Sequence, residues 1–241
     1  MSESNHITEA IVLAGGLGTR LRKSIGEFPK VLAPIAGKPF LAYLLDYLSQ
    51  QGISTVVLAV GYKWELVQKE FGDNYKGIQI HYSIEKEPLG TGGAIKLASQ
   101  HISSENCIAM NGDTLFTIDL KELCAFHTSK SGECSIALKP MLNSERYGSV
   151  DINDHNRILK FNEKEFREKS FINGGVYCLN LAAFNKIIGS EKFSFETDYL
   201  AKNANHGLFG LVSDAYFKDI GIPTDYEQFE KDIINNSIHG I

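Results

Sequence analysis

The sequence is poor in the features that mark several classes of protein. It has only four cysteines, Cys107, Cys124, Cys134 and Cys178, and no two of them form a C-x-x-C pair. No apolar run approaches the roughly 18 residues that a membrane-spanning helix needs. The first eight residues, 1–8, are polar and lack the apolar core of an export signal. These absences predict a cytoplasmic protein with reduced, mainly structural cysteines and no membrane partner.

The chain also lacks a strong excess of charge of either sign. Its formal net charge is −5 over 241 residues, and no stretch forms the basic stripe that binding to duplex nucleic acid requires. We therefore expect no nucleic-acid partner. An acidic protein that binds a polyphosphate has to supply positive charge locally, so Arg and Lys residues close to glycines are informative.

Several catalytic motifs are missing as well. The chain has no G-x-S-x-G nucleophile turn, and its seven histidines show no H-E-x-x-H spacing. It also has no internal repeat, no low-complexity linker and no tail of hexapeptide repeats. Residues 1–241 are therefore predicted to form a single domain with two lobes and without a serine nucleophile or a histidine-bound metal.

Apolar strands and amphipathic helices alternate along the first half of the sequence. The predicted elements are strand 9–13, helix 38–51, strand 55–60, helix 64–71, strand 78–83, helix 91–101 and strand 107–110. This alternation predicts the α/β class, with a doubly wound, mainly parallel, Rossmann-like sheet. Such sheets bind ligands at the carboxyl ends of their strands, so the segments that follow the strands form the candidate site.

The second half follows a less regular pattern. Strands are predicted over residues 134–139, 149–152, 176–179 and 214–220, and a closing helix over 225–234. Charged or glycine-rich turns separate these elements. Asp225 is predicted to lie at the amino-terminal end of the closing helix.

A glycine-rich segment follows the first predicted strand, with the sequence Leu13-Ala14-Gly15-Gly16-Leu17-Gly18-Thr19-Arg20-Leu21. Its glycines allow close backbone approach to a ligand, and successive N–H groups in such a loop can cradle phosphate oxygens. Arg20 offers a planar fork for phosphate, and Lys30 offers a mobile charge. The segment fits neither the G-x-x-x-x-G-K-S/T loop nor the G-x-G-x-x-G fingerprint, since Leu21 replaces the third glycine. The alternative is a plain glycine-rich turn with surface cations.

Two aspartates follow predicted strands. Asp113 comes directly after Asn111-Gly112, and Asp219 lies in the segment Lys218-Asp219-Ile220-Gly221. Carboxylates are hard oxygen ligands that suit Mg²⁺, and residues far apart in an α/β sequence can meet in one pocket. The alternative is an ordinary turn aspartate beside a glycine.

These segments resemble the sugar-1-phosphate nucleotidyltransferases. The resemblance rests on residues 15–21 with Pro29-Lys30, continues through residues 31–39, and covers nearly the whole chain because later motifs recur in order. It departs at Lys23, where many members carry proline. The resemblance implies a glycosyltransferase-A-like fold, with a nucleotide-binding part over about residues 1–126 and a smaller sugar-phosphate-binding lobe over about residues 127–241.

The resemblance also implies roles for the residues in these segments. The triphosphate is expected on the glycine loop, at Leu13, Ala14, Gly15, Gly16, Gly18, Thr19 and Arg20. Arg20 is expected to assist the departure of pyrophosphate and Lys30 to contact phosphates. Asp113 and Asp219 are expected to bind Mg²⁺ next to the reacting α-phosphate. The acceptor's phosphate oxygen attacks directly, so catalysis needs positioning and electrostatics rather than a protein nucleophile.

The segment 85–94 resembles the family's second nucleotide loop, with Gly90 and Thr91 near the nucleotide and Glu85 facing the base. Glycines 90, 92 and 93 permit close backbone approach. One carboxylate can accept both N1–H and N2–H of guanine, whereas uracil and thymine present one donor between two acceptors, which suits an amide better. A charge-assisted hydrogen bond contributes about 1.5–3 kcal/mol. Glu85 therefore predicts GTP; the alternative is a solvated charge at a strand end.

A third group of residues matches the family's sugar-phosphate site. By that match Gly148 and Glu163 contact the sugar, Lys164 contacts its phosphate, and Asn173 and Asn111 lie in the sugar region. On chemistry alone, the charge-rich segment 160–169 is typical of a solvated face. The sequence also departs from the family here, because Glu165 follows the lysine where proline is usual.

Within the family, the chain resembles guanylyltransferases that act on D-glycero-α-D-manno-heptose 1-phosphate, yielding GDP-heptose and pyrophosphate for capsule or lipopolysaccharide synthesis. One alternative is transfer to mannose, glucose or N-acetylsugar 1-phosphate with GTP or UTP. Others are cytidylyl transfer to phosphocholine and a non-catalytic, nucleotide-binding regulatory module. The expected partners are GTP and a sugar 1-phosphate, and assembly into a homo-oligomer is left open.

Overall fold

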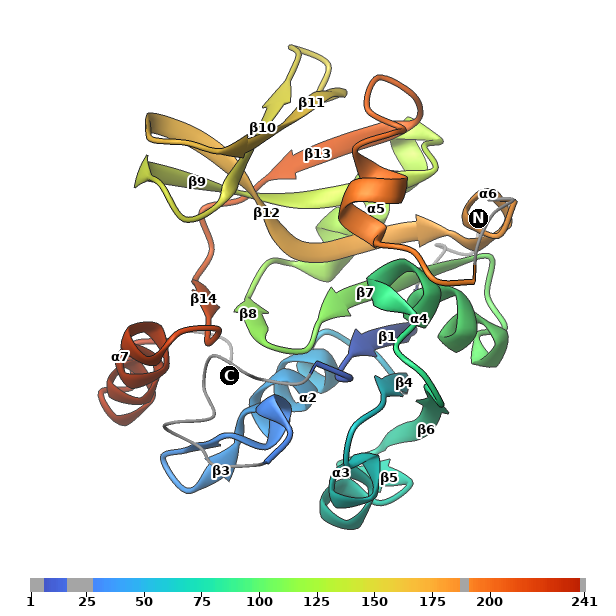
Figure 1. Cartoon of the computed structure of the whole chain (residues 1–241), viewed down its shortest axis with the longest axis vertical. Coiled ribbons are helices and arrows are strands. Elements are labelled where there is room, and N and C mark those ends of the chain that lie inside the picture. The colour runs from blue at the N-terminus through green and yellow to red at the C-terminus, as the bar shows by residue number, and fades with distance from the viewer. Residues whose placement is uncertain (1–6, 17–27, 187–190, 239–241) are drawn as a thin grey trace.

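The computed structural model describes residues 7–16, 28–186 and 191–238 (Figure 1). Four parallel strands form the lower half of the view in Figure 1: β1 (Glu9–Leu13), β4 (Thr55–Val60), β6 (Ile78–Ile84) and β7 (Asn106–Asn111). They lie in the order β7-β1-β4-β6. Because the chain adds strands first on one side of β1 and then on the other, the order reverses between β1 and β7. This is the arrangement in which doubly wound sheets open a crevice at the strand ends.

Helices cover both faces of the parallel strands, which explains why these strands are apolar along their length. Side chains alternate between the two faces, so Val12 joins one core cluster and Ile11 the other. The first cluster takes residues from α2 (Phe40–Gln50), α3 (Trp64–Phe71), α5 (Leu120–Lys130) and α7 (Pro223–Ile234). The second takes residues from α4 (Gly90–Ala98), α6 (Leu181–Phe184) and the π-helical turn η3 (Phe195–Leu200).

The second half of the chain extends the same sheet with mostly antiparallel strands. The longest is β12 (Arg167–Asn180), whose last residues pair with β7. The others are β9 (Cys134–Ser144), β10 (Gly148–Ile152), β11 (Ile158–Lys164) and β13 (Leu208–Val212). They stand above the parallel strands in Figure 1 and complete a ten-stranded sheet together with β5 (Asn74–Tyr75). The predicted α/β class with a parallel central sheet is confirmed.

Several elements differ from the sequence predictions at their ends. The predicted helix 38–51 begins at Phe40, because Lys38 and Pro39 form β3, which pairs with β2 (Pro34–Ile35). The predicted strand 214–220 is reduced to β14 (Phe217–Asp219). Strands β11 and β13 were not predicted, since β11 carries charged residues that are typical of a solvated segment. The remaining short elements are η1 (Lys30–Leu32), η2 (Ser99–His101) and β8 (Thr114–Phe116).

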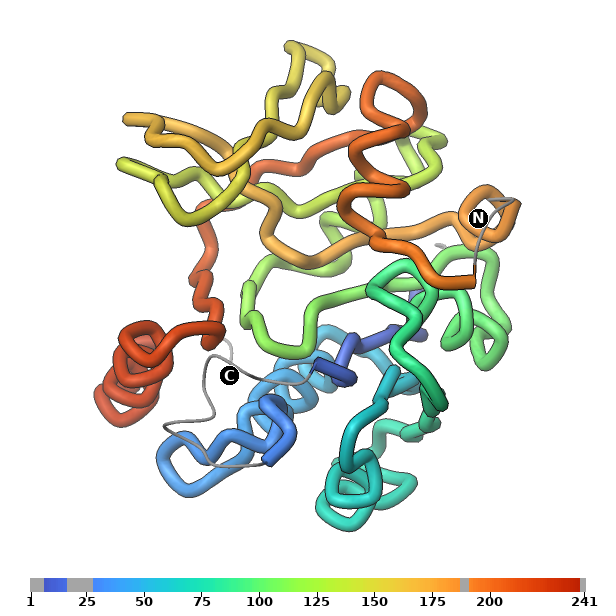
Figure 2. Tube along the Cα trace, viewed as in Figure 1, coloured from blue at the N-terminus to red at the C-terminus, as the bar shows by residue number. Residues whose placement is uncertain are grey.

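The last part of the chain returns to the parallel half. Figure 2 follows the trace from β13 down to β14 and α7, beside the green segment that contains β8. β14 pairs antiparallel with β8, and Asp219 lies opposite Thr114. This two-stranded ladder fixes the C-terminal segment at the carboxyl end of β7.

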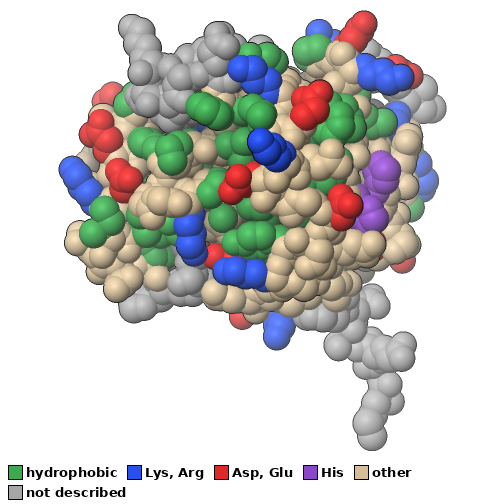
Figure 3. Space-filling model, turned by 90° about the horizontal axis from the view of Figure 1, so that it is seen from below, with side chains coloured by type: hydrophobic (Ala, Val, Ile, Leu, Met, Phe, Trp, Pro, Cys, Tyr) green, Lys and Arg blue, Asp and Glu red, His purple; other side chains and the backbone are tan. Residues whose placement is uncertain are grey.

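The surface carries charges of both signs. On the face shown in Figure 3, Lys and Arg side chains alternate with Asp and Glu side chains among apolar and neutral atoms. Within the described ranges, no helix is long and apolar enough to cross a membrane.

Candidate functional site

A cavity of about 550 Å³ lies at the carboxyl ends of the four parallel strands, and its size is typical of a small-molecule site. Ten residues singled out in the sequence line it: Leu13, Ala14, Gly15, Gly16, Lys30, Glu85, Gly90, Thr91, Asn111 and Asp113. Three further candidates, Gly18, Thr19 and Arg20, lie outside the described residues. The cavity therefore joins the segments after β1, β6 and β7 in one place.

A close backbone contact joins the ends of β1 and β7. The N–H of Gly112 donates to the carbonyl of Leu13 at 2.9 Å, and a Cβ at position 112 would overlap that carbonyl oxygen. On the side of β1 that faces β4, the N–H of Ala14 donates to the carbonyl of Ala59 at 2.8 Å. Glycine at position 112 thus lets the glycine loop lie directly beside Asp113.

The two predicted metal carboxylates both lie next to Lys30, although of the two only Asp113 lines the cavity. The β8–β14 ladder places Asp219 opposite Thr114, and the N–H of Ile220 donates to the carbonyl of Asp113 at 3.0 Å. Lys30 Nζ lies 2.5 Å from Oδ2 of Asp113 and 4.0 Å from Oδ1 of Asp219. Burial, and then the charge of Asp113, raise the pKa of Asp219. Two carboxylates and one ammonium group give this cluster a formal charge of −1.

The chemistry of this cluster suits a hard divalent cation. The side chains of Asp113 and Asp219 are 39% and 28% exposed, so their oxygens are accessible to a small ion. In the part of the chain that the structure describes, no group of three or more His, Cys, Asp or Glu residues could hold a metal. A cation between these two carboxylates would need further oxygens from water or from a ligand, which is how proteins commonly hold Mg²⁺.

Glu85 lies where the segments after β1, β4 and β6 meet. The N–H of Leu89 donates to its Oε2 at 2.9 Å, while a Cβ built on Gly15 would lie 3.0 Å from its Oε1. Burial raises the pKa of the Glu85 carboxyl. One carboxylate oxygen is therefore held by the backbone, and the other lies against Gly15 of the glycine loop. A half-buried acceptor in this position can recognise a group that presents N–H donors.

The glycines at the start of α4 allow close approach of another part of the chain, at Phe193. Gly90 has φ +73°, and a Cβ there would lie 2.6 Å from the carbonyl oxygen of Phe193. Gly92 and Gly93 donate to that same oxygen at 3.0 and 3.3 Å, and a Cβ on Gly92 would overlap the Phe193 ring. Of these glycines only Gly90 lines the cavity. Gly92 and Gly93 accommodate the protein's own chain rather than a ligand.

Thr91 fixes a residue that the sequence did not single out as part of the site. Its hydroxyl donates to Oε2 of Glu196 at 2.7 Å and accepts from the N–H of Phe195 at 2.8 Å. Glu196 lines the cavity. The signal in the sequence is the segment Phe195-Glu196-Thr197-Asp198, which resembles another segment of the family but also allows a purely structural role for Glu196. The other lining residues that were not named as site residues are Val31, Gly61, Tyr62, Lys86, Glu87, Pro88 and Ala94.

Most of the predicted sugar-contacting residues lie outside the cavity. Glu163 and Lys164 are exposed on β11, and Lys164 pairs with Gly148 across the β10–β11 ladder. Asn173 Oδ1 accepts from the N–H of Gly175 at 2.9 Å, at a register shift in β12. Gly175 has φ +72° and lies against the side chain of Asn111. Asn173 thus adjoins the cavity through Gly175, and only Asn111 of this group lines it.

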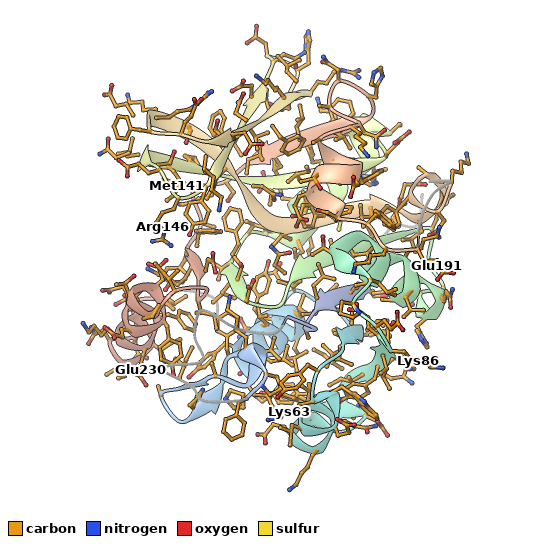
Figure 4. All side chains as sticks on the ribbon, viewed as in Figure 1. Lys63, Lys86, Met141, Arg146, Glu191 and Glu230 are labelled. Carbon is orange, nitrogen blue, oxygen red and sulfur yellow. The ribbon has the colours of Figure 1, made fainter. Side chains whose placement is uncertain are left out.

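The turn between β9 and β10 approaches the carboxylates from the upper half. Burial, and then the charge of Asp219, raise the pKa of Tyr147 to about 12. Arg146 donates to Oδ2 of Asp225 at 2.5 Å. In Figure 4 the Arg146 label stands between the upper strands and α7. This ion pair joins the two halves of the fold close to the carboxylates.

Comparisons with known proteins agree on one family. Residues 9–236 match the family described as nucleotidyl transferase. The chain is 50% identical over 226 residues to the D-glycero-alpha-D-manno-heptose 1-phosphate guanylyltransferase of Aneurinibacillus thermoaerophilus, a match that covers 93% of this chain and 98% of that relative. It is 46% identical over 229 residues to the enzyme of the same name from Campylobacter jejuni, covering 95% and 100% respectively.

A solved structure gives the same likeness in three dimensions. The crystal structure of HddC from Yersinia pseudotuberculosis complexed with GMP-PN matches this chain with a TM-score of 0.83 at 35% identity. The match covers 94% of this chain and 100% of that one, so both halves of the fold are included.

Proposed function

The chain belongs to the nucleotidyl transferase family, as its sequence predicted, and from that membership we propose that it transfers GMP from GTP to D-glycero-α-D-manno-heptose 1-phosphate. The products are GDP-heptose and pyrophosphate, for the synthesis of surface glycans. The observation that carries the proposal is the Lys30–Asp113–Asp219 cluster beside the glycine loop, in which Lys30 and Asp113 line the cavity. Two relatives with the guanylyltransferase name, aligned over nearly the whole chain, support the choice of substrates.

In the proposed reaction, an oxygen of the sugar phosphate attacks the α-phosphorus of GTP, and the bond to pyrophosphate breaks. Asp113 and Asp219 would hold Mg²⁺, which when bound supplies positive charge beside the reacting phosphate. Lys30 contributes a second cation and, by its contact with Asp113, keeps that carboxylate in place. The backbone of residues 13–16 approaches the triphosphate, and Arg20 assists the departing pyrophosphate. Every contribution is positioning or electrostatics, so the reaction needs no protein nucleophile.

Recognition of the two substrates is divided between the halves of the fold. Glu85 accepts the two N–H donors of guanine with its carboxylate, and Gly90 and Thr91 lie beside the nucleotide. Asn111, Gly148, Glu163 and Asn173 contact the sugar, and Lys164 contacts its phosphate. Because Glu163 and Lys164 are exposed on β11, this assignment requires the β10–β11 hairpin to lie over the bound sugar. The single-domain organisation and the cytoplasmic location remain predictions, and assembly into a homo-oligomer is left open.

Release of pyrophosphate tests the proposal directly. The purified chain with Mg²⁺ is assayed with GTP, UTP, CTP, dTTP and ATP, each crossed with the heptose, mannose and glucose 1-phosphates. Release with GTP and the manno-heptose phosphate, with GDP-heptose identified by mass spectrometry, is the expected result. Release with UTP or dTTP alone would contradict the guanine assignment but keep the reaction class. Absence of release with every pair would contradict the proposed function.

A further inference from the structure

Tyr62 is an aromatic residue at the cavity to which neither the proposed mechanism nor the sequence gives a role. It lines the cavity and yet is 41% exposed, which is high for an aromatic side chain of this size. It belongs to the short connection between β4 and α3, in the half of the fold that carries the parallel strands. In Figure 4 the labels of the neighbouring Lys63 and of Lys86 mark this half of the molecule.

The pairing of β4 with β6 places Tyr62 at the Glu85 end of the cavity. The two strands are parallel, and Val60 lies opposite Ile84. The next residues along the two strands are Gly61 and Glu85, and a Cβ on Gly61 would lie 3.9 Å from Cβ of Glu85. Tyr62 therefore follows directly on the point at which Glu85 faces the glycine loop.

The backbone of this connection forms a hydrogen-bonded turn. The N–H of Trp64 donates to the carbonyl of Gly61 at 3.2 Å, which closes a turn with Tyr62 and Lys63 at its centre. Lys63 has φ +54° and ψ 35°, a left-handed conformation that residues other than glycine seldom adopt. Its Nζ lies 5.2 Å from the centre of the Tyr62 ring. Unfavourable backbone conformations of this kind are retained where the surrounding structure or the function requires them.

We propose that Tyr62 is a specificity residue whose ring stacks on the face of the nucleotide base while Glu85 accepts the donors at its edge. This inference rests on the proposed function, since it needs a base at the Glu85 end of the cavity. Aromatic rings stack on nucleobases through their π-faces. The two fused rings of a purine offer a larger face than a pyrimidine, so stacking favours GTP over UTP in addition to the hydrogen bonds at Glu85. The hydroxyl of Tyr62 has no part in this contact.

Equilibrium binding separates this inference from the question of catalysis. Trp64 is the only tryptophan in the chain and lies two residues after Tyr62, so its fluorescence can report binding of GTP or UTP in the presence of Mg²⁺. The variants are Tyr62→Phe, which keeps the ring, and Tyr62→Leu, which removes it. Phe166→Leu is the matched control, because Phe166 is 61% exposed and lies away from the cavity. Circular dichroism and Tm establish that each variant is folded.

The expected result is a Kd for GTP that rises about 10- to 100-fold in Tyr62→Leu and stays within about twofold of wild type in Tyr62→Phe and in the control. The Kd for UTP should rise less, and the KM for the sugar phosphate should not change. A wild-type Kd for GTP in a folded Tyr62→Leu would overturn the stacking role alone. Equal losses in Tyr62→Phe and Tyr62→Leu would overturn it in favour of the hydroxyl. If the wild-type chain binds neither nucleotide, the proposed function fails together with this inference.

Discussion

The ammonium nitrogen of Lys30 lies 2.5 Å from a carboxylate oxygen of Asp113, although 83 residues separate the two in the chain. A contact over that sequence distance exists only because η1 follows the glycine loop and Asp113 follows β7, and both reach the same end of the sheet. The contact brings together a cation and a carboxylate with different roles in the proposed reaction, since Lys30 contacts phosphates and Asp113 holds Mg²⁺. Removing either charge should therefore affect the reaction more than the fold.

Asp113→Asn tests the carboxylate. We expect kcat/KM to fall by at least about 100-fold, because a preorganised charge beside the reacting phosphate is lost. The fold should persist, since the amide keeps the shape of the side chain and the Asp113 carboxylate is partly exposed. Steady-state pyrophosphate release measures the effect, and Asp214→Asn is the control, because Asp214 is a carboxylate that is 90% exposed and pairs with Lys139. Equal activity in the two variants would contradict the assignment.

Asp219→Asn is expected to abolish activity and to raise stability at neutral pH. Burial and the charge of Asp113 raise the pKa of Asp219 in the folded state. Ionisation of Asp219 therefore lowers the free energy of unfolding as the pH rises through that pKa. This cost is absent below the pKa that Asp219 has in the unfolded chain. The amide removes this cost and can still accept from the N–H of Gly221, which donates to Asp219 at 2.6 Å. In thermal unfolding, the Tm of Asp219→Asn should exceed that of the wild type by about 2–4 °C for each kcal/mol by which the substitution raises the free energy of unfolding.

Addition of Mg²⁺ and GTP provides the second measurement on Asp219. A ligand that binds only the folded state raises Tm. Because Asp219→Asn lacks one of the two proposed metal carboxylates, Mg²⁺ and GTP should raise the Tm of the wild-type chain more than that of the variant. A variant that is less stable than the wild type without ligand would contradict the argument, as would an equal gain in both chains.

Glu85→Gln should change the base preference. We expect kcat/KM with GTP to fall about 10- to 100-fold, the equivalent of about 1.5–3 kcal/mol, since an amide accepts only one of the two guanine donors. The ratio of UTP to GTP activity should rise. Glu65→Gln, an exposed change on α3 outside the cavity, serves as the control. An unchanged ratio of UTP to GTP activity would remove Glu85 from base recognition.

The same carboxylate predicts a pH dependence of GTP binding. Because burial raises the pKa of Glu85, the wild-type Kd for GTP should begin to rise at a higher pH than an ordinary glutamate would allow. Protonation removes the charged acceptor, so binding weakens as the pH falls. Trp64 fluorescence titrations at several pH values measure this, and Glu85→Gln should lack this part of the pH profile.

His127 sets an acid limit on stability. Its ring is 3% exposed, and burial lowers its pKa to about 4. One neutral tautomer fits its surroundings, with Nε2–H donating to Oδ1 of Asn106 at 3.3 Å and Nδ1 accepting from the Ser135 hydroxyl at 3.0 Å. As the pH falls from 6.5, the pKa of an ordinary histidine, towards 4, the unfolded chain binds the proton first. The free energy of unfolding therefore falls by about 3 kcal/mol over this range.

The effect of His127 is measured as Tm against pH. The slope for the wild-type chain between about pH 6.5 and 4 should exceed that for His127→Gln, which cannot titrate in this range. Parallel curves for the two chains would show that groups other than His127 cause the loss of stability at acid pH.

Local sequence patterns predicted the first half of the molecule well. The apolar runs before Gly15 and before Asn111 behave as buried strands, and that periodicity was enough to place the glycine loop, Glu85 and Asp113 at one edge of the sheet. The resemblance to a family added the glycosyltransferase-A-like fold and the reaction class, which are confirmed. The roles of individual residues stay predictions.

Contacts between distant segments were not legible in the sequence. Gly92 looked like a ligand-facing glycine, but Phe193, about a hundred residues away, takes up the space beside it. Tyr62 gave no signal, because one tyrosine after a strand has no pattern until β4 and β6 are paired. Lys164 matched a family position, yet nothing in its surroundings fixes it near the cavity. Non-local packing decided each of these cases.

The β8–β14 ladder has a consequence for the making of the protein. It joins residues 114–116 to residues 217–219, so a growing chain on the ribosome can form the Lys30–Asp113 pair long before the second carboxylate exists. Pairings over such long loops also form late in folding. A nascent chain or a prematurely terminated one that ends before β14 would present a glycine loop and one aspartate, but no complete carboxylate pair. The carboxylate pair that the proposed reaction needs is therefore complete only when residues 217–219 pair with β8.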